Sequence, residues 1–151
     1  MASQQMFQRL NAFLNMSHSL REGLNRRAKE LIGLTLEQVL LLCRIDLLGG
    51  RATISSLASA NHRASHTVSG MVQDLARLGL ASKSRPLSDD RRQVQVFLTP
   101  QGRAKVELYR ASIEHLLGPV FSSNGSPELA AELDRLILAL EELLKDAGGE
   151  T

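Results

Sequence analysis

The sequence has little of several residue types, and each shortage excludes a class of protein. Cys43 is the only cysteine among 151 residues, so no intrachain disulfide can form and an intracellular setting is expected. Aromatic residues make up only 3%, so the core must consist mainly of leucine, valine, isoleucine and alanine. No apolar run approaches the roughly 20 residues that span a bilayer, and the first residues lack the pattern of a signal peptide. We therefore expect a cytoplasmic protein without a membrane partner.

The sequence also lacks the patterns that catalysis and metal binding require. We find no nucleophile beside a base, no Gly-rich phosphate loop and no carboxylate pair at catalytic spacing. His62 and His66 are four residues apart, but they straddle a turn without a cysteine or acid beside them. Cys43 lies in an apolar run, where a thiol usually packs inertly. We expect neither an enzyme nor a cofactor or metal site.

Hydrophobic content of 43% and charged content of 23% are typical of a folded globular domain. The net charge of +2 hides an uneven distribution. Residues 51–105 carry nine lysines and arginines against three aspartates, whereas residues 106–151 carry three basic residues against nine acids. The middle of the chain can therefore attract a polyanion that its C-terminal part would repel.

Periodicity and capping signals predict a mainly α fold with one small antiparallel β-hairpin (α+β). Thr35, followed by Gln38, has the spacing of a capping box, and Thr99-Pro100 and Ser126-Pro127 are typical helix starts. The expected helices cover residues 3–32, 35–48, 54–60, 65–80, 100–117 and 126–147, with strands at 81–86 and 93–99. This order is that of a winged helix-turn-helix with helical extensions at both ends.

The helix expected over residues 65–80 has two different faces. Val68, Met71, Val72, Leu75 and Leu78 form an apolar stripe, and Ser65 is the expected N-cap. The opposite side carries His66, Gly70, Gln73 and Arg77, with Ser69 on its flank. In a helix-turn-helix, the second helix presents such residues to base edges in the major groove. The alternative is an ordinary amphipathic helix with a solvated face.

The hairpin tip is rich in charge. Asp90 lies two residues before Arg92 and can orient its guanidinium, which a narrow minor groove would attract. Arg91, Lys83 and Arg85 are candidate phosphate contacts. Each of these charges could instead be a solvated surface residue.

Three segments together resemble the MarR family of bacterial transcriptional regulators: "LTLEQVLLL", "SHTVSGMVQDLARLGLASKSRP" and "DRRQVQVFLTPQG". The last is similar to the family's wing, with an Asp-x-Arg tip and a Leu-Thr-x-x-Gly helix start. Here these residues are Asp90, Arg92, Leu98, Thr99 and Gly102. The resemblance covers nearly the whole chain but departs at Gly70, where the family often carries arginine.

The resemblance implies a homodimer, with residues 1–32 as an N-terminal dimerisation helix and residues 100–147 as C-terminal dimerisation helices. Residues 34–99 would form the DNA-binding domain, intertwined with these helices in one structural domain per subunit. It also implies a pocket for a small-molecule effector. Arg21 interrupts the apolar stripe of the first helix, with Ser17 and His18 nearby, and could bind an anionic aromatic compound. The alternative is a structural ion pair of Arg21.

The sequence hypothesis is thus a homodimeric repressor that an effector releases from palindromic double-stranded DNA. The alternative is a winged-helix protein-interaction module without sequence-specific DNA binding. The operator, the regulated genes and the effector's identity cannot be read from the sequence.

Overall fold

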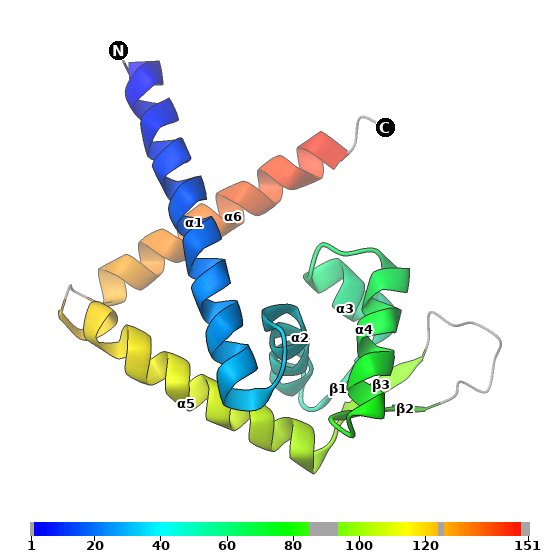
Figure 1. The fold of residues 1–151 in the computed structure, drawn as a ribbon. Helices are drawn as coiled ribbons and strands as arrows, with labels where there is room; N and C mark the ends of the chain where they lie inside the picture. The colour runs from blue at the N-terminus through cyan, green and yellow to red at the C-terminus, as the bar shows by residue number, and fades with distance from the viewer. Residues whose placement is uncertain (1, 85–93, 124–125, 149–151) are drawn as a thin grey trace. The chain divides into compact units, whose positions relative to one another are not determined.

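The computed structural model describes residues 2–84, 94–123 and 126–148 of the chain (Figure 1). The chain divides into two compact units, residues 1–110 and residues 111–151, with the boundary inside one long helix. The elements are α1 (Ala2–Ile32), α2 (Leu36–Leu47), β1 (Arg51–Thr53), α3 (Ile54–Ala60), α4 (Ser65–Arg77), β2 (Ala81–Ser84), β3 (Gln95–Leu98), α5 (Pro100–Ser123) and α6 (Ser126–Gly148). Among the described residues, no helix is long and apolar enough to cross a membrane.

The capping box predicted at the start of α2 is confirmed. The Thr35 hydroxyl accepts a hydrogen bond from the Gln38 backbone N–H at 3.2 Å, and the Gln38 side chain accepts one from the Thr35 N–H at 3.0 Å. The Asn25 side chain in α1 accepts from the Leu36 N–H at 2.9 Å, which ties α1 to the same helix end. These bonds satisfy N–H groups that the first turn of a helix leaves without partners.

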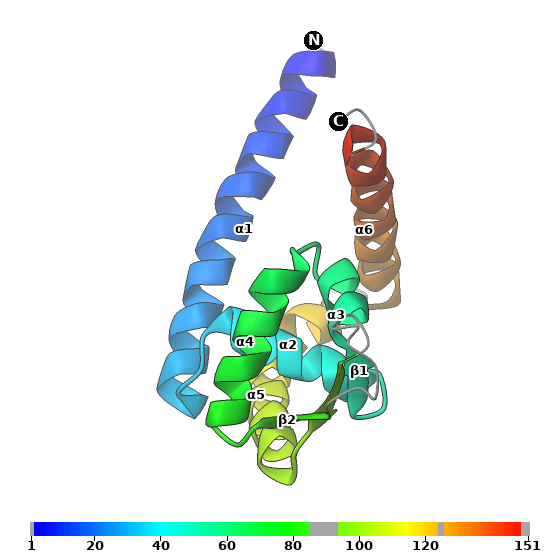
Figure 2. The same ribbon diagram turned by 90° about the vertical axis from the view of Figure 1, so that its right-hand side faces the viewer.

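The C-terminal part of α1 lies against α2, while its N-terminal half extends away from the rest of this unit (Figures 1 and 2). Ala28, in the C-terminal part of α1, is fully buried, whereas Met6, Leu10 and Phe13 remain 70%, 47% and 42% exposed. The apolar stripe of α1 is therefore covered only near its C-terminal end.

Helix α4 buries three of the five residues of the predicted stripe, while Met71 is half-buried. Val68, Val72 and Leu75 are fully buried, so one face of α4 is fixed to the core. Leu78 is 56% exposed, and its predicted core position is wrong. The helix ends at Arg77 because Gly79 adopts a left-handed backbone with φ of 72°, and Leu78 is only the C-cap.

The predicted N-cap of α4 is also wrong. Ala64 occupies the N-cap position with extended backbone angles and no side-chain hydrogen bond. Ser65 is instead the first helical residue, so its hydroxyl is not used for capping and remains exposed.

A three-stranded antiparallel sheet takes the place of the simple hairpin that the sequence predicts. Its order is β1-β3-β2, with Arg51 opposite Phe97 and Ser82 also opposite Phe97 on the other side. The short β1 was not predicted because three residues cannot show alternation. The side chain of Val96 in β3 is fully buried. The predicted mainly helical winged fold is confirmed, and residues 85–93 of the hairpin lie outside the described residues.

Helix α5 begins as predicted but continues further. The Thr99 hydroxyl accepts a hydrogen bond from the Gly102 N–H at 3.0 Å and donates one to the Gly79 carbonyl at 2.7 Å. A Cβ at Gly102 would lie 2.0 Å from the Leu80 carbonyl oxygen, so this contact requires glycine. The predicted end at Leu117 is wrong, because α5 runs through Pro119 to Ser123. A proline removes one backbone hydrogen bond, and that local loss does not stop this helix.

Helix α6 starts at Ser126, as predicted. One face of α6 carries an apolar stripe that is exposed in the single chain: Leu129, Leu133, Leu136, Ile137, Leu140, Leu143 and Leu144.

Candidate nucleic-acid interface

The exposed side of α4 borders a cleft of about 410 Å³. The residues that line it come from two helices: Ile54, Ser55, Ser65, His66, Ser69, Gly70 and Gln73. Five of the predicted DNA contacts are therefore brought together on one surface. The cleft offers three serine hydroxyls, an imidazole and an amide, which can donate hydrogen bonds to base edges or accept them.

Ser55 and Ile54 were not predicted as part of this surface. A capping box at the start of α3 places them there. The Thr53 hydroxyl accepts from the Ser56 N–H at 3.1 Å, and the Ser56 hydroxyl accepts from the Thr53 N–H at 3.1 Å. The Ser55 hydroxyl lies 3.2 Å from that of Thr53. The sequence signal was the Thr-x-x-Ser spacing, but the sequence does not reveal that α3 borders α4 here.

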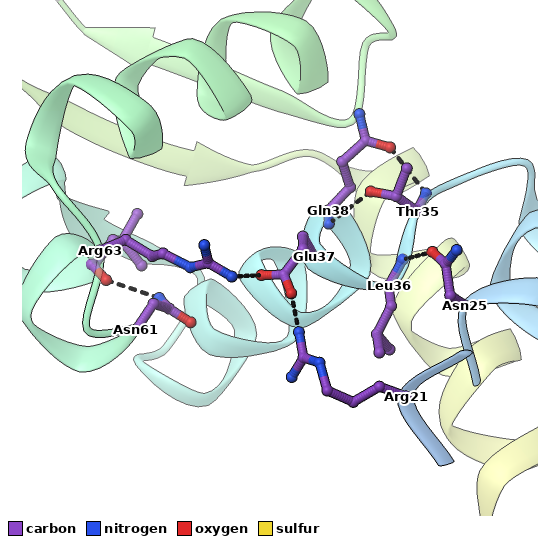
Figure 3. Close-up of polar contacts among 9 residues, drawn as sticks. Arg21, Asn25, Thr35, Leu36, Glu37, Gln38, Asn61 and Arg63 are labelled. Carbon is purple, nitrogen blue, oxygen red and sulfur yellow. Dashed lines mark hydrogen bonds and ion pairs between the residues drawn. The ribbon is translucent and has the colours of Figure 1, made fainter. Parts of the chain in front are cut away.

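The turn between α3 and α4 is fixed by local and long-range contacts. The Asn61 side-chain amide donates to the Leu57 carbonyl at 2.7 Å, and His62 takes a left-handed backbone with φ of 49°. The Arg63 guanidinium pairs with the Glu37 carboxylate of α2 at 3.2 Å (Figure 3). The same carboxylate pairs with Arg21 of α1. Glu37 therefore links α1, α2 and the turn that leads into α4.

The other predicted DNA contacts differ in their surroundings. Arg77, at the end of α4, pairs with Asp74 at 3.1 Å and is 68% exposed. Lys83 lies exposed on β2. Arg85, Asp90, Arg91 and Arg92 lie outside the described residues.

The apolar stripe around Arg21 suggested that this residue lies on a buried helix face. In the single chain it does not. Its side chain is 55% exposed, and its pairing with Glu37 agrees with the ion-pair alternative. His18 lies 3.5 Å from Glu22 on the same helix and is 74% exposed, while Ser17 is half-buried. The apolar stripe of α1 is covered only near α2, so Arg21 remains accessible to water.

A second ionic cluster lies within residues 1–110. Asp46 in α2 pairs with Arg103 and with Arg110 of α5, each at 2.9 Å, and the Asp46 side chain is only 10% exposed. Burial raises the pKa of the nearby Cys43 thiol, although the Arg110 charge partly opposes this. A raised pKa disfavours the reactive thiolate, in agreement with inert packing. Among the described residues, no group of three histidines, cysteines or acids could hold a metal ion.

Comparison with known proteins gives structural matches only. No family model and no curated protein sequence matches the chain. A MarR family transcription regulator superposes with a TM-score of 0.77 at 25% identity, covering 99% of this chain and 97% of that one. The Staphylococcus aureus regulator MepR, in a complex with DNA, gives a TM-score of 0.72 at 23% identity, covering 88% and 96%.

A third match is the organohalide-sensing transcriptional regulator RdhR in its 2,4-dichlorophenol-bound form. It gives a TM-score of 0.69 at 22% identity and covers 91% of this chain and 79% of that one. These matched proteins are transcriptional regulators. Nearly the whole chain thus has the winged-helix fold of the MarR family of transcriptional regulators, as its three sequence motifs predicted.

Proposed function

We propose that this chain is a homodimeric, DNA-binding transcriptional repressor that a small-molecule effector releases from a palindromic operator. One observation carries the proposal: the side of α4 away from the core presents hydrogen-bonding groups around an open cleft. Within the described part of the chain, the side chains of Ser65, Ser69 and Gln73 make no hydrogen bond or ion pair. Polar groups that have no partner among the described residues are available to read base edges.

The charge distribution supports DNA as the partner. The α4 surface belongs to the segment 51–105, whose net charge is +6 from nine basic and three acidic residues. Phosphate contacts from lysines and arginines supply affinity that is independent of sequence. Arg77, Lys83, Arg85, Arg91 and Arg92 are the proposed phosphate or minor-groove contacts, with Asp90 orienting Arg92. A protein-interaction module would have no need for this basic charge, and the matched MepR structure contains DNA.

Dimerisation is part of the proposal. The N-terminal half of α1 and the stripe of α6 each expose apolar side chains to an extent that a monomer rarely tolerates. A second copy would bury them, as the family resemblance implies. Two copies of α4 would then enter major grooves about one helical turn apart, or a multiple of that spacing.

The proposal also places an effector near Arg21. Arg21 is accessible, and its partner Glu37 also pairs with Arg63 beside the turn into α4. An anionic aromatic effector held by Arg21, with Ser17 and His18 beside it, would compete with Glu37 for the guanidinium. The matched RdhR structure holds a chlorinated phenol, and a phenolate is one anion of this kind.

The test is DNA binding measured as a function of salt. We expect sites selected from a random DNA library to contain an inverted repeat, with affinity falling steeply between about 50 and 200 mM salt. Arg92→Ala should weaken binding and reduce the salt slope by roughly one for each phosphate that is no longer neutralised. If the wild-type protein selects no sequence and shows no salt-dependent binding, the protein-interaction alternative is favoured.

Asp90→Ala tests how Arg92 is held. If Asp90 orients the arginine, its loss should weaken DNA binding even though it removes a negative charge. Tighter binding by this variant would mean that the acid only repels DNA.

A further inference from the structure

Gly70 differs from the glycines whose presence the fold explains. Gly33, Gly49, Gly50 and Gly79 have positive φ, and Gly102 has no room for a Cβ. Gly70 lies inside α4, its backbone is helical, and a Cβ there would meet no atom within 4 Å. Alanine would stabilise a helix at such a position. Nothing inside the described chain therefore requires glycine at this point.

The residues around Gly70 indicate what kind of partner would fit against it. Gly70 lines the cleft together with Ser69 and Gln73 of α4 and with Ile54 of α3. Ile54 is 5% exposed. Its side chain and the Cα of Gly70, which carries no side chain, give the cleft an apolar portion. The cleft thus combines an apolar surface with flanking hydrogen-bonding groups.

That combination is complementary to one feature of the major groove. Thymine is the base that presents a methyl group there, beside hydrogen-bonding groups of its own pair and of its neighbours. Arginine or lysine at this point would favour guanine, but glycine offers no donor. A glutamine amide can hold adenine through two hydrogen bonds, and Gln73 lies one helical turn beyond Gly70.

We propose that the cleft over Gly70 is a thymine-binding site. In it the methyl group of the base lies against Gly70 and Ile54, while Gln73 binds an adjacent adenine. This inference rests on the proposed DNA-binding function and names the base class that α4 reads. The missing side chain allows the backbone of α4 to approach the base edge more closely than an alanine would permit.

The experiment uses the full-length protein and the DNA sites that it selects from a random library. Each thymine of the half-site is replaced in turn by uracil, which removes only the methyl group. At one thymine per half-site, wild-type affinity should fall about fourfold, the effect expected when the burial of one methyl group is removed. Uracil at the other thymines should have little effect.

Gly70→Ala is the matching protein variant. Its Cβ would occupy the place proposed for the thymine methyl group, so binding to the selected site should weaken by at least about tenfold, and the uracil effect at the identified thymine should disappear. Binding to DNA of unrelated sequence should remain as in the wild type, because phosphate contacts dominate it. Gly23→Ala in α1 is the control, since its Cβ would meet only the end of Arg26 at 4.0 Å.

The Tm of each variant shows whether misfolding causes the expected loss of DNA affinity. Both alanine variants should raise the Tm, by about 3 °C for a chain of this size, and only Gly70→Ala should lose affinity. Two results would refute the thymine-binding site but not the proposed DNA binding. One is that Gly70→Ala binds the selected site as tightly as the wild type, and the other is that no thymine methyl group contributes to the affinity. If the wild-type protein selects no DNA at all, the proposed function fails as well.

Discussion

The guanidinium of Arg21 in α1 donates a hydrogen bond to the carboxylate of Glu37 in α2, sixteen residues further along the chain. The same carboxylate forms an ion pair with Arg63 from the turn before α4 (Figure 3). An arginine that interrupts an apolar helix stripe thus has an ionic partner in its own chain. Because the side chains of Arg21 and Glu37 are 55% and 38% exposed, water screens much of their attraction.

We predict that Arg21→Met changes the free energy of unfolding by no more than about 1 kcal/mol, as for other exposed ion pairs. Urea denaturation of Arg21→Met, Glu37→Gln and the double variant would give the coupling energy of the pair. The same variants distinguish the effector role. If Arg21 binds an anionic effector, Arg21→Met should keep its DNA affinity but no longer be released by that ligand. A loss of several kcal/mol would instead mean that the dimer buries the pair.

The second prediction concerns the exposed stripe of α6. Leu136 and Leu140 are 40% and 38% exposed in the single chain, and the proposed dimer buries them. Glutamate at both positions would place charges in that interface, so the double variant should sediment as a monomer or become insoluble. Leu138 lies off the stripe and is 60% exposed, so Leu138→Glu should sediment like the wild type. A wild-type protein that is monomeric at micromolar concentration would refute the dimer.

The third prediction concerns Cys43. Burial raises the pKa of its thiol above the ordinary value for cysteine, with Arg110 opposing part of the shift. Because the folded pKa is higher than the unfolded one, the thiol's stabilising contribution is complete below the unfolded pKa and is lost as pH rises through the folded pKa. At a pH of about 8, a thiol reagent should therefore label Cys43 more slowly in the native protein than in urea.

A functional control follows for the same residue. Cys43→Ser should bind DNA like the wild type, both with and without prior peroxide treatment. Rapid native labelling, or peroxide-induced release that Cys43→Ser abolishes, would instead show a redox role.

The elements that were predicted correctly carry local signals. The capping box at Thr35 and the helix start at Thr99 each depend on side chains within a few residues of the helix end. Strand β1 could not be predicted in this way, because three residues become a strand only by pairing with β3, as between Arg51 and Phe97. Helix α5 continued past Pro119 although the local signal predicted its end.

The candidate site shows the same division. The polar side of α4 follows from helical spacing alone, so His66, Ser69 and Gln73 could be predicted. The contribution of Ser55 could not, because it depends on how α3 packs beside α4. The ionic partner of Arg21 was also beyond sequence reasoning, since Glu37 belongs to another helix.

The last prediction concerns the charged pair at the end of α4. Arg77 pairs with Asp74 at 3.1 Å, and both side chains are well exposed, at 68% and 55%. If Arg77 contacts a phosphate, the Asp74 carboxylate competes for the same guanidinium and also repels DNA. Asp74→Asn should therefore strengthen DNA binding, while Arg77→Ala should weaken it and reduce the salt slope by about one. Both effects should be similar for selected and unrelated DNA, because phosphates carry no sequence information.

Gln73→Ala is the contrasting variant, since an amide that reads a base should change preference at one base pair per half-site by about 1–3 kcal/mol. The two variants thus separate affinity from specificity on a single helix face. If Arg77→Ala altered sequence preference while Gln73→Ala weakened binding to all DNA equally, the assigned roles would have to be exchanged. If neither variant affected binding, α4 would not be the element that contacts DNA, whatever the affinity of the protein as a whole.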